Sequence, residues 1–127
     1  MAQLVICLDT NYLIRSLVQG SHEVGEILAW VEQGQLLTTS AICWYEFLGG
    51  PVSSNQTEGV RSLLHQIIPF TEKESAEAAR LFHLIGRSRK LRVDCMIAGT
   101  ALLHEAHLAT ANRKDFTPFL THGLKLA

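Results

Sequence analysis

The fold of this chain is decided by the stretch Leu4-Val5-Ile6-Cys7-Leu8-Asp9-Thr10-Asn11. Its five apolar residues are followed at once by an acid, a hydroxyl and an amide. A short apolar run that is closed by polar turn residues is typical of a buried parallel strand with both faces covered. In open α/β sheets the functional groups lie beyond the carboxyl ends of the strands, and Asp9 falls at this place.

The length and composition predict one globular domain that covers residues 1–127. Of the 127 residues, 47% are hydrophobic, which is enough for a core and too apolar for a disordered chain. No apolar run approaches the roughly 20 residues that cross a bilayer, and the amino terminus lacks the basic region of a signal peptide. Three cysteines without a C-x-x-C pair argue against a disulfide framework and predict a cytoplasmic protein.

The charge balance restricts how this chain can bind nucleic acid. A formal net charge of −1 excludes a broadly basic nucleic-acid binder. Any nucleic acid must therefore be bound by a local basic patch or through metal ions.

Short strands alternate with helices along the sequence. Helices are predicted after a cap at Thr10 or Asn11, over 22–33, 41–48 and about 58–66, from the capping box Thr71-x-x-Glu74 through Ile85, and over 94–105. Further strands are predicted at 36–39, 67–70 and 108–110, followed by a tail, 116–127, with room for one short last strand. This alternation predicts a three-layer α/β/α protein with a short, mainly parallel central sheet.

The acidic residues converge on one edge of the predicted sheet. The three aspartates of the chain are Asp9 at the end of the first strand, Asp94 at the start of the most apolar helix, and Asp115 after the last strand. Strand carboxyl ends and helix amino ends share one edge in a parallel α/β layer. Glu46, in the second turn of the helix that Ser40 caps, is placed to lean toward the same edge.

Four carboxylates at one place repel each other, and a divalent cation removes this conflict. Mg²⁺ and Mn²⁺ prefer carboxylate and water oxygens, so the four acids predict a site for one or two such ions. Such a site can activate water, orient a phosphodiester and stabilise the leaving oxygen. Each acid alone can also be interpreted as a turn, cap or solvated residue, so the prediction depends on their joint placement.

Four motifs in this order resemble the PIN-domain ribonucleases, in particular the VapC-type toxins of toxin–antitoxin pairs. They are Leu8-Asp9-Thr10-Asn11, Thr39-Ser40 followed by Glu46, the D-x-x-I-A-x-T-A pattern of 94–101, and Thr110-x-Asn112-x-x-Asp115-Phe116. The resemblance covers nearly the whole chain and implies a PIN-like fold. It also implies a metal-dependent endoribonuclease that hydrolyses RNA phosphodiesters by metal-activated water.

The resemblance further implies roles for individual residues and partners. The acids that would hold Mg²⁺ or Mn²⁺, one or two ions per site, are Asp9, Glu46, Asp94 and Asp115. The groups that would orient these carboxylates are those of Thr10, Asn11, Ser40, Thr110 and Asn112. A homodimer and a cognate antitoxin protein are the implied assemblies. The chain departs from the family pattern at Gly99, where alanine is frequent, and at Val93 and Cys95, where some relatives carry an extra acid.

A basic segment before Asp94 is a candidate contact for RNA phosphates. The candidate cations are Arg87, Arg89, Lys90 and Arg92, together with Arg113 and Lys114 beside Asp115. A solvated linker explains the same charges equally well.

Two other functions remain as alternatives. A phosphoacceptor receiver domain has similar size and layering, but it needs an aspartate after a middle strand, and none lies between Asp9 and Asp94. A catalytically silent PIN module that binds only RNA or a protein would carry the same motifs with one carboxylate turned away.

Overall fold

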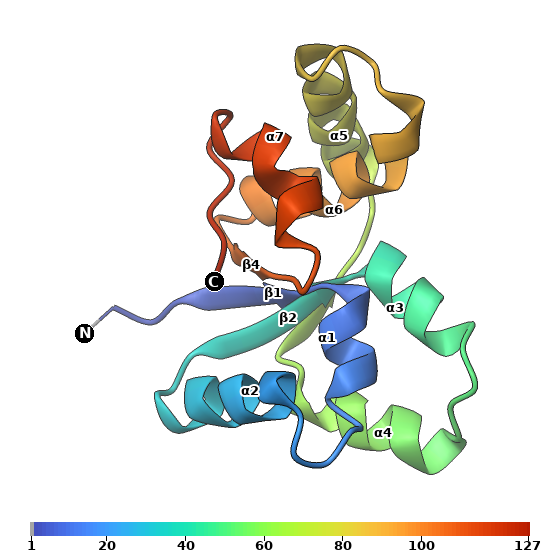
Figure 1. Cartoon of the computed structure of the whole chain (residues 1–127), viewed down its shortest axis with the longest axis vertical. Helices are drawn as coiled ribbons and strands as arrows, with labels where there is room; N and C mark the ends of the chain where they lie inside the picture. The colour runs from blue at the N-terminus through green and yellow to red at the C-terminus, as the bar shows by residue number, and fades with distance from the viewer. Residues whose placement is uncertain (1) are drawn as a thin grey trace.

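The computed structural model describes residues 2–127 and has a four-stranded parallel sheet between two layers of helices (Figure 1). The strands are β1 (Val5–Leu8), β2 (Leu36–Ser40), β3 (Gln66–Ile68) and β4 (His107–Ala109), in the spatial order β3-β2-β1-β4. β1 pairs in parallel with both β2 and β4, so the first strand lies inside the sheet. The predicted three-layer α/β/α fold is confirmed.

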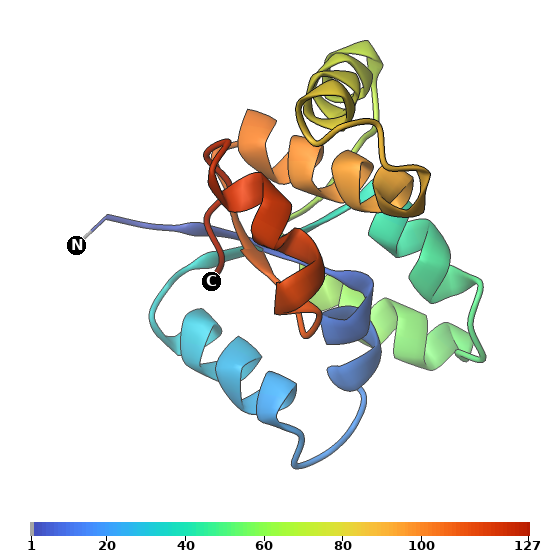
Figure 2. The ribbon, with the colours of Figure 1, turned by 45° about the horizontal axis from the view of Figure 1, so that its top comes forward.

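The helices are α1 (Thr10–Arg15), α2 (His22–Glu32), α3 (Ala41–Leu48), α4 (Ser54–Leu63), α5 (Glu72–Leu84), α6 (Arg92–Leu103) and α7 (Thr117–Leu120). Figure 1 shows α1, α2 and α4 below the sheet and α5, α6 and α7 above it. The tilted view of Figure 2 keeps this separation. α3 contacts both α1 and α6, so it joins the two helical layers at the end of the sheet. Within residues 2–127, every helix is too short or too polar to pass through a bilayer.

The central strands are buried because helices cover both faces of the sheet. Ile6, Cys7 and Leu8 of β1 are each at most 2% exposed. Thr38 and Thr39 of β2 are equally buried, and their hydroxyls donate to the carbonyl oxygens of Ile6 and Leu8 at 3.0 and 2.7 Å. These side-chain bonds satisfy the buried hydroxyls and add to the ladder that joins β2 to β1.

Two predicted helix starts were wrong because the capping residues were misassigned. Asp9, and not Thr10 or Asn11, caps α1, and its carboxylate accepts the backbone N–H of Thr10. α4 begins at Ser54 rather than near Glu58, because the residue before it forms a capping box with the glutamine three positions later.

The second half of the chain differs from the prediction at two places. α6 begins at Arg92, so Asp94 lies inside the first turn of the helix and not at its cap. The tail contains the short helix α7, which has Pro118 in its first turn, where proline is favoured. The last strand is reduced to a single parallel bridge between Leu126 and Leu108.

α5 and α6 touch backbone to backbone at one point. A Cβ placed on Gly99 would lie 2.9 Å from the backbone nitrogen of Ala78 and 3.0 Å from its Cα. Because both atoms belong to the backbone, a side chain at this position requires one helix to move. The absence of a side chain at Gly99 therefore has a structural reason.

A buried acid also joins α5 to α6. Glu74 is 3% exposed, and its carboxylate accepts the backbone N–H of Thr71 at 2.8 Å and the hydroxyl of the same residue. The Nε2 atom of His104 lies 2.7 Å from the other oxygen. The hydrogen bonds from Thr71, followed by that from His104, lower the pKa of Glu74 to about 2. The predicted capping box at Thr71 is confirmed.

We expect Gly99→Ala to lower the free energy of unfolding by about 1–3 kcal/mol, because the added methyl group forces the two helices apart. Urea denaturation followed by far-UV circular dichroism measures the change. Gly59→Ala is the matched control, since that glycine also lies in a helix but has open space within 4 Å of the place that a Cβ would take. The Gly59→Ala substitution should leave the free energy of unfolding unchanged or raise it slightly, because alanine favours the helix more than glycine does. A G99A protein as stable as the wild type would contradict the close contact.

We expect the Glu74 carboxylate to stabilise the protein in a pH-dependent way. Its pKa is lower in the folded than in the unfolded chain, so the stabilisation is complete at neutral pH and is lost as the pH falls from about 4.5 toward 2. Urea denaturation at pH 6 and pH 3 should therefore show a larger loss of stability for the wild type than for Glu74→Gln. Equal losses in the two proteins would argue against this role.

Candidate functional site

Three of the four predicted acids line one pocket beyond the carboxyl end of β1. The pocket has a volume of about 350 Å³. Its lining residues are Asp9, Thr10, Asn11, Ile14, Glu46, Val93, Asp94, Ile97 and Asn112. Asp115 does not line the pocket, but its charge acts on Asp94.

Asp9 is the buried member of the group, with only 5% of its surface exposed. Its Oδ1 atom accepts the backbone N–H of Thr10 at 2.8 Å and the thiol of Cys43 at 3.6 Å. Its Oδ2 atom accepts the Asn11 amide at 3.2 Å and the Thr110 hydroxyl at 2.7 Å. These four hydrogen bonds fix the orientation of the carboxylate in the wall of the pocket.

Glu46 is exposed and is held by a hydrogen bond from α1. The hydroxyl of Thr10 donates to Oε1 of Glu46 at 2.6 Å, while the backbone of the same residue donates to Asp9. Thr10 therefore connects two of the acids. Ser40 acts at a greater distance, because its hydroxyl accepts the backbone N–H of Cys43 at 3.1 Å and so begins the helix that carries Glu46.

Asp94 is partly buried in the first turn of α6, close to the other acids. Burial, followed by the charges of Asp9, Asp115 and Glu46, raises the pKa of Asp94 to about 6. Throughout residues 2–127, none of the ion pairs includes any of these four carboxylates. Their mutual repulsion is therefore not offset by a side-chain cation.

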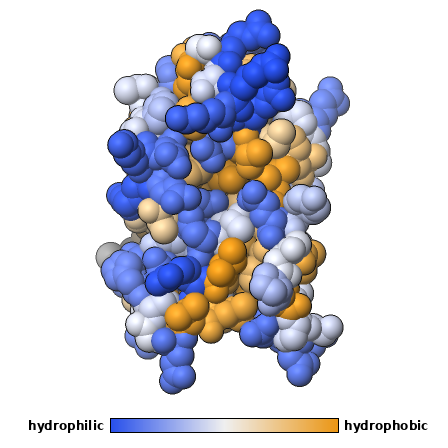
Figure 3. All heavy atoms as spheres, turned by 45° about the vertical axis from the view of Figure 1, so that its right-hand side comes forward, coloured by the Kyte–Doolittle hydropathy of each residue, from blue (hydrophilic) through white to orange (hydrophobic). Residues whose placement is uncertain are grey.

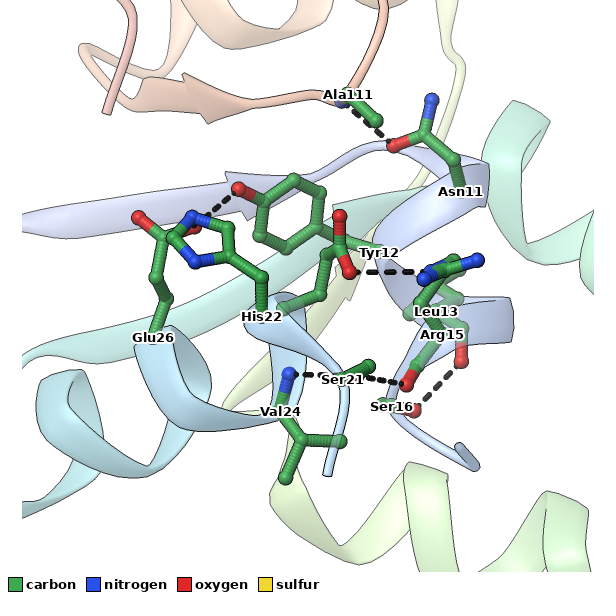
Figure 4. A network of polar contacts seen from close by, with 11 residues as sticks. Asn11, Tyr12, Leu13, Arg15, Ser16, Ser21, His22, Val24, Glu26 and Ala111 are labelled. Carbon is green, nitrogen blue, oxygen red and sulfur yellow. Dashed lines mark hydrogen bonds and ion pairs between the residues drawn. The ribbon is translucent and has the colours of Figure 1, made fainter. Parts of the chain in front are cut away.

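The end of β4 is tied to the same site. Asn11 accepts the backbone N–H of Ala111 through its Oδ1 atom at 3.0 Å (Figure 4). The Thr110 hydroxyl accepts the backbone N–H of Asn112 at 3.0 Å, and the carbonyl of Asn112 accepts that of Asp115 at 3.0 Å. A chain of hydrogen bonds thus leads from the carboxylate of Asp9 to the backbone of Asp115.

α1, which carries Thr10 and Asn11 into the site, is held by α2. Figure 4 shows the hydroxyl of Tyr12 pointing toward Glu26, to which it donates at 2.5 Å. Burial and this hydrogen bond raise the pKa of Tyr12, so the phenol keeps its proton. Arg15 pairs with a glutamate of α2 at 3.0 Å. These contacts fix the helix on the side away from the pocket.

The candidate RNA-contacting cations are all exposed. They are Arg87, Arg89 and Lys90 in the connection before α6, Arg92 in its first turn, and Arg113 and Lys114 beside Asp115. Figure 3 shows hydrophilic side chains gathered where α5 ends, with apolar side chains exposed below them. None of the six lines the pocket, but Arg92 and Arg113 are next in the sequence to the lining residues Val93 and Asn112.

The donor set suits a hydrated divalent cation better than a closed metal cage. The acids of the pocket offer carboxylate oxygens, which Mg²⁺ and Mn²⁺ prefer. In the described part of the chain, no group of three or more His, Cys, Asp or Glu side chains is arranged to hold a metal ion. Mg²⁺ commonly binds through one or two carboxylates and keeps several waters. A pocket of about 350 Å³ has room for an ion with such waters.

The sequence did not indicate two features of this site. Cys43 was counted only among the cysteines, yet its thiol contacts the buried acid. The one signal was its place three residues after Ser40, in the first turn of the predicted helix. The apolar pocket walls formed by Ile14, Val93 and Ile97 had no signal of their own, since apolar residues at these spacings are usual in helices.

The comparisons with known proteins concern the family and the fold of the chain. A family model described as PIN domain matches residues 6–117, a range that contains all four acids. No curated protein matches the sequence. A toxin–antitoxin complex from Klebsiella pneumoniae has a chain with a TM-score of 0.66 and 27% identity, and the match covers 88% of this chain and 90% of that chain.

Two further solved structures share the fold. VapBC-1 from nontypeable Haemophilus influenzae has a TM-score of 0.70 and 23% identity, with 98% of this chain and 97% of that chain covered. VapBC2 from Rickettsia felis, bound to a DNA fragment from its promoter, has a TM-score of 0.69 and 21% identity, with 98% of both chains covered. The arrangement of layers described above is therefore shared over almost the whole chain.

We expect Asp94→Asn to stabilise the metal-free protein at pH 7.5. The ionised carboxylate is destabilised by burial and by three like charges, so a neutral amide removes a cost on the order of 1 kcal/mol after solvent screening. In the wild type the same cost decreases as the pH falls below about 6, where Asp94 begins to take up a proton, and it is gone once the pH is below the ordinary carboxyl pKa of about 4. Urea denaturation in EDTA at pH 7.5 and pH 5 measures both effects.

The matched control is Glu58→Gln, which neutralises an exposed acid of α4 outside the pocket. It should change the stability by less than about 0.5 kcal/mol. A destabilised D94N protein at pH 7.5 would show that the repulsion among the acids is not significant.

Proposed function

This chain belongs to the PIN-domain family, and on that premise we propose that it is a Mg²⁺- or Mn²⁺-dependent endoribonuclease, the toxin of a toxin–antitoxin pair. The observation that carries the proposal is that Asp9, Glu46 and Asp94 line one pocket. The charge of Asp115 acts on Asp94, and in residues 2–127 no side-chain cation forms an ion pair with any of the four acids. Uncompensated negative charge of this kind favours a divalent cation.

The four acids would hold one or two ions, which when bound would supply an activated water and stabilisation of the leaving oxygen in phosphodiester hydrolysis. The side chains around the acids orient the groups that would bind the ions. Thr10 and Thr110 keep the carboxylates oriented through the hydrogen bonds described above, and Asn11 links α1 to the end of β4 by accepting the backbone N–H of Ala111. Thr10 carries the one hydroxyl among the described residues that line the pocket, and its proton is directed to Glu46.

The proposal includes the partners. Two of the similar structures are described as VapBC and one as a toxin–antitoxin complex, which supports a cognate antitoxin for this chain. Exposed apolar side chains on α1, on α2 and in the connection between them offer such a protein a surface beside the site, namely Ile14, Val18, Leu28 and Val31. A homodimer, a cytoplasmic location, a single domain over residues 1–127 and RNA contacts by the six exposed cations are part of the same proposal.

A catalytically silent PIN module that binds RNA or a protein is the alternative. It is favoured by one observation: no three acids in the described residues stand in an arrangement that could hold a metal ion. The receiver-domain alternative is excluded by the family match. A test for RNA cleavage distinguishes the two remaining functions, the endoribonuclease and the silent module.

We expect the purified protein to cleave a pool of structured RNAs with Mn²⁺ and to be inactive in EDTA. Asp9→Asn should lower the cleavage rate by roughly 100-fold or more, because the buried carboxylate is lost as a ligand. Glu58→Gln serves as the control that changes charge outside the pocket. Gel analysis of end-labelled RNA gives the rates.

Cleavage that persists in EDTA or in the Asp9→Asn protein would contradict the proposed metal site. Binding of RNA without cleavage at saturating Mn²⁺ would favour the silent module.

A further inference from the structure

The hydrogen bonds of Asp9 reach it from two sides. Thr10 and Asn11 line the pocket, whereas Cys43 and Thr110 do not. The thiol of Cys43 is completely buried and lies 3.6 Å from Oδ1. The carboxylate is therefore supported from the core as well as from the pocket.

The number of donors limits how Asp9 can bind a cation. An ionised carboxylate has about four lone-pair positions, and Asp9 already accepts four hydrogen bonds. A cation that enters from the pocket must displace a donor there. The Thr10 donor is a backbone N–H fixed in α1, whereas the Asn11 amide is a side chain at 3.2 Å. Asn11 is thus the donor that can yield, while the two donors on the core side stay in place.

We propose that Cys43 is a positioning residue for Asp9, whose thiol holds Oδ1 from the core side while a divalent cation occupies the pocket side. The inference rests on the proposed function, because it assumes that Asp9 binds a cation. It assigns a role to a residue of α3 that does not itself line the pocket.

The surroundings of Cys43 suit this role. The Cys43 thiol is completely buried, and the Asp9 carboxylate is the acceptor that it meets there. Ser40 accepts the backbone N–H of Cys43 at 3.1 Å, which fixes the residue at the start of α3. Glu46 follows three residues later on the same helix. One helix turn therefore sets the positions of both acids relative to each other.

The test is the affinity for Mn²⁺ alone, measured by isothermal titration calorimetry without RNA. We expect Cys43→Ala to weaken Mn²⁺ binding roughly 10-fold. This is the lower end of the loss in metal affinity that follows when a group that hydrogen-bonds a metal ligand is removed. Cys43→Ser should keep more of the affinity, because a hydroxyl is also a donor. Cys7→Ala is the matched control, since Cys7 is equally buried but makes no hydrogen bond to Asp9 among the described residues.

The expected result is a loss of Mn²⁺ affinity in Cys43→Ala that is absent in Cys7→Ala, although both variants lose stability from the vacated volume. Equal Mn²⁺ affinities in the wild type and Cys43→Ala would overturn the inference and leave the proposed function standing. A wild-type protein that binds no Mn²⁺ would overturn both. If Cys43→Ala does not fold, Cys43→Val, which also lacks a donor, takes its place in the comparison.

Discussion

Repulsion among carboxylates at the carboxyl end of β1 is the constraint on which the rest of this structure depends. Asp9, Glu46, Asp94 and Asp115 come from distant parts of the sequence, and the charges of the other three act on Asp94. A fold that gathers like charges without a paired cation gives up stability at that place. Such a cost is usual at functional sites, where an arrangement that is unfavourable alone becomes favourable once a ligand binds.

Hydrogen bonds from uncharged donors hold two of these acids, Asp9 and Glu46, in place. The hydroxyls of Thr10 and Thr110, the amide of Asn11 and the thiol of Cys43 all direct protons at carboxylate oxygens. These donors come from α1, from α3 and from the end of β4, so the site depends on the correct assembly of the whole sheet edge. Because none of them carries a charge, the negative potential that attracts a cation is preserved.

The sequence predicted the architecture because its signals are local and strong. The apolar run before Asp9 and the alternation of strands and helices were sufficient for a parallel three-layer fold, and the motifs identified the acids. The helix starts at Ser54 and Arg92 were missed, since polar and basic residues carry no hydrophobic period. The donation from Cys43 to Asp9 joins residues 34 apart in the sequence, so no local pattern could reveal it.

The most direct test of the central claim is the melting temperature of the wild-type protein as Mn²⁺ is added at pH 7.5. If the gathered acids are a cation site, ligand binding to the folded state raises the melting temperature progressively with Mn²⁺ concentration. The same titration of Asp9→Asn should give a much smaller rise. A melting temperature that Mn²⁺ leaves unchanged in the wild type, or raises equally in both proteins, would contradict the assignment of these carboxylates to a metal site.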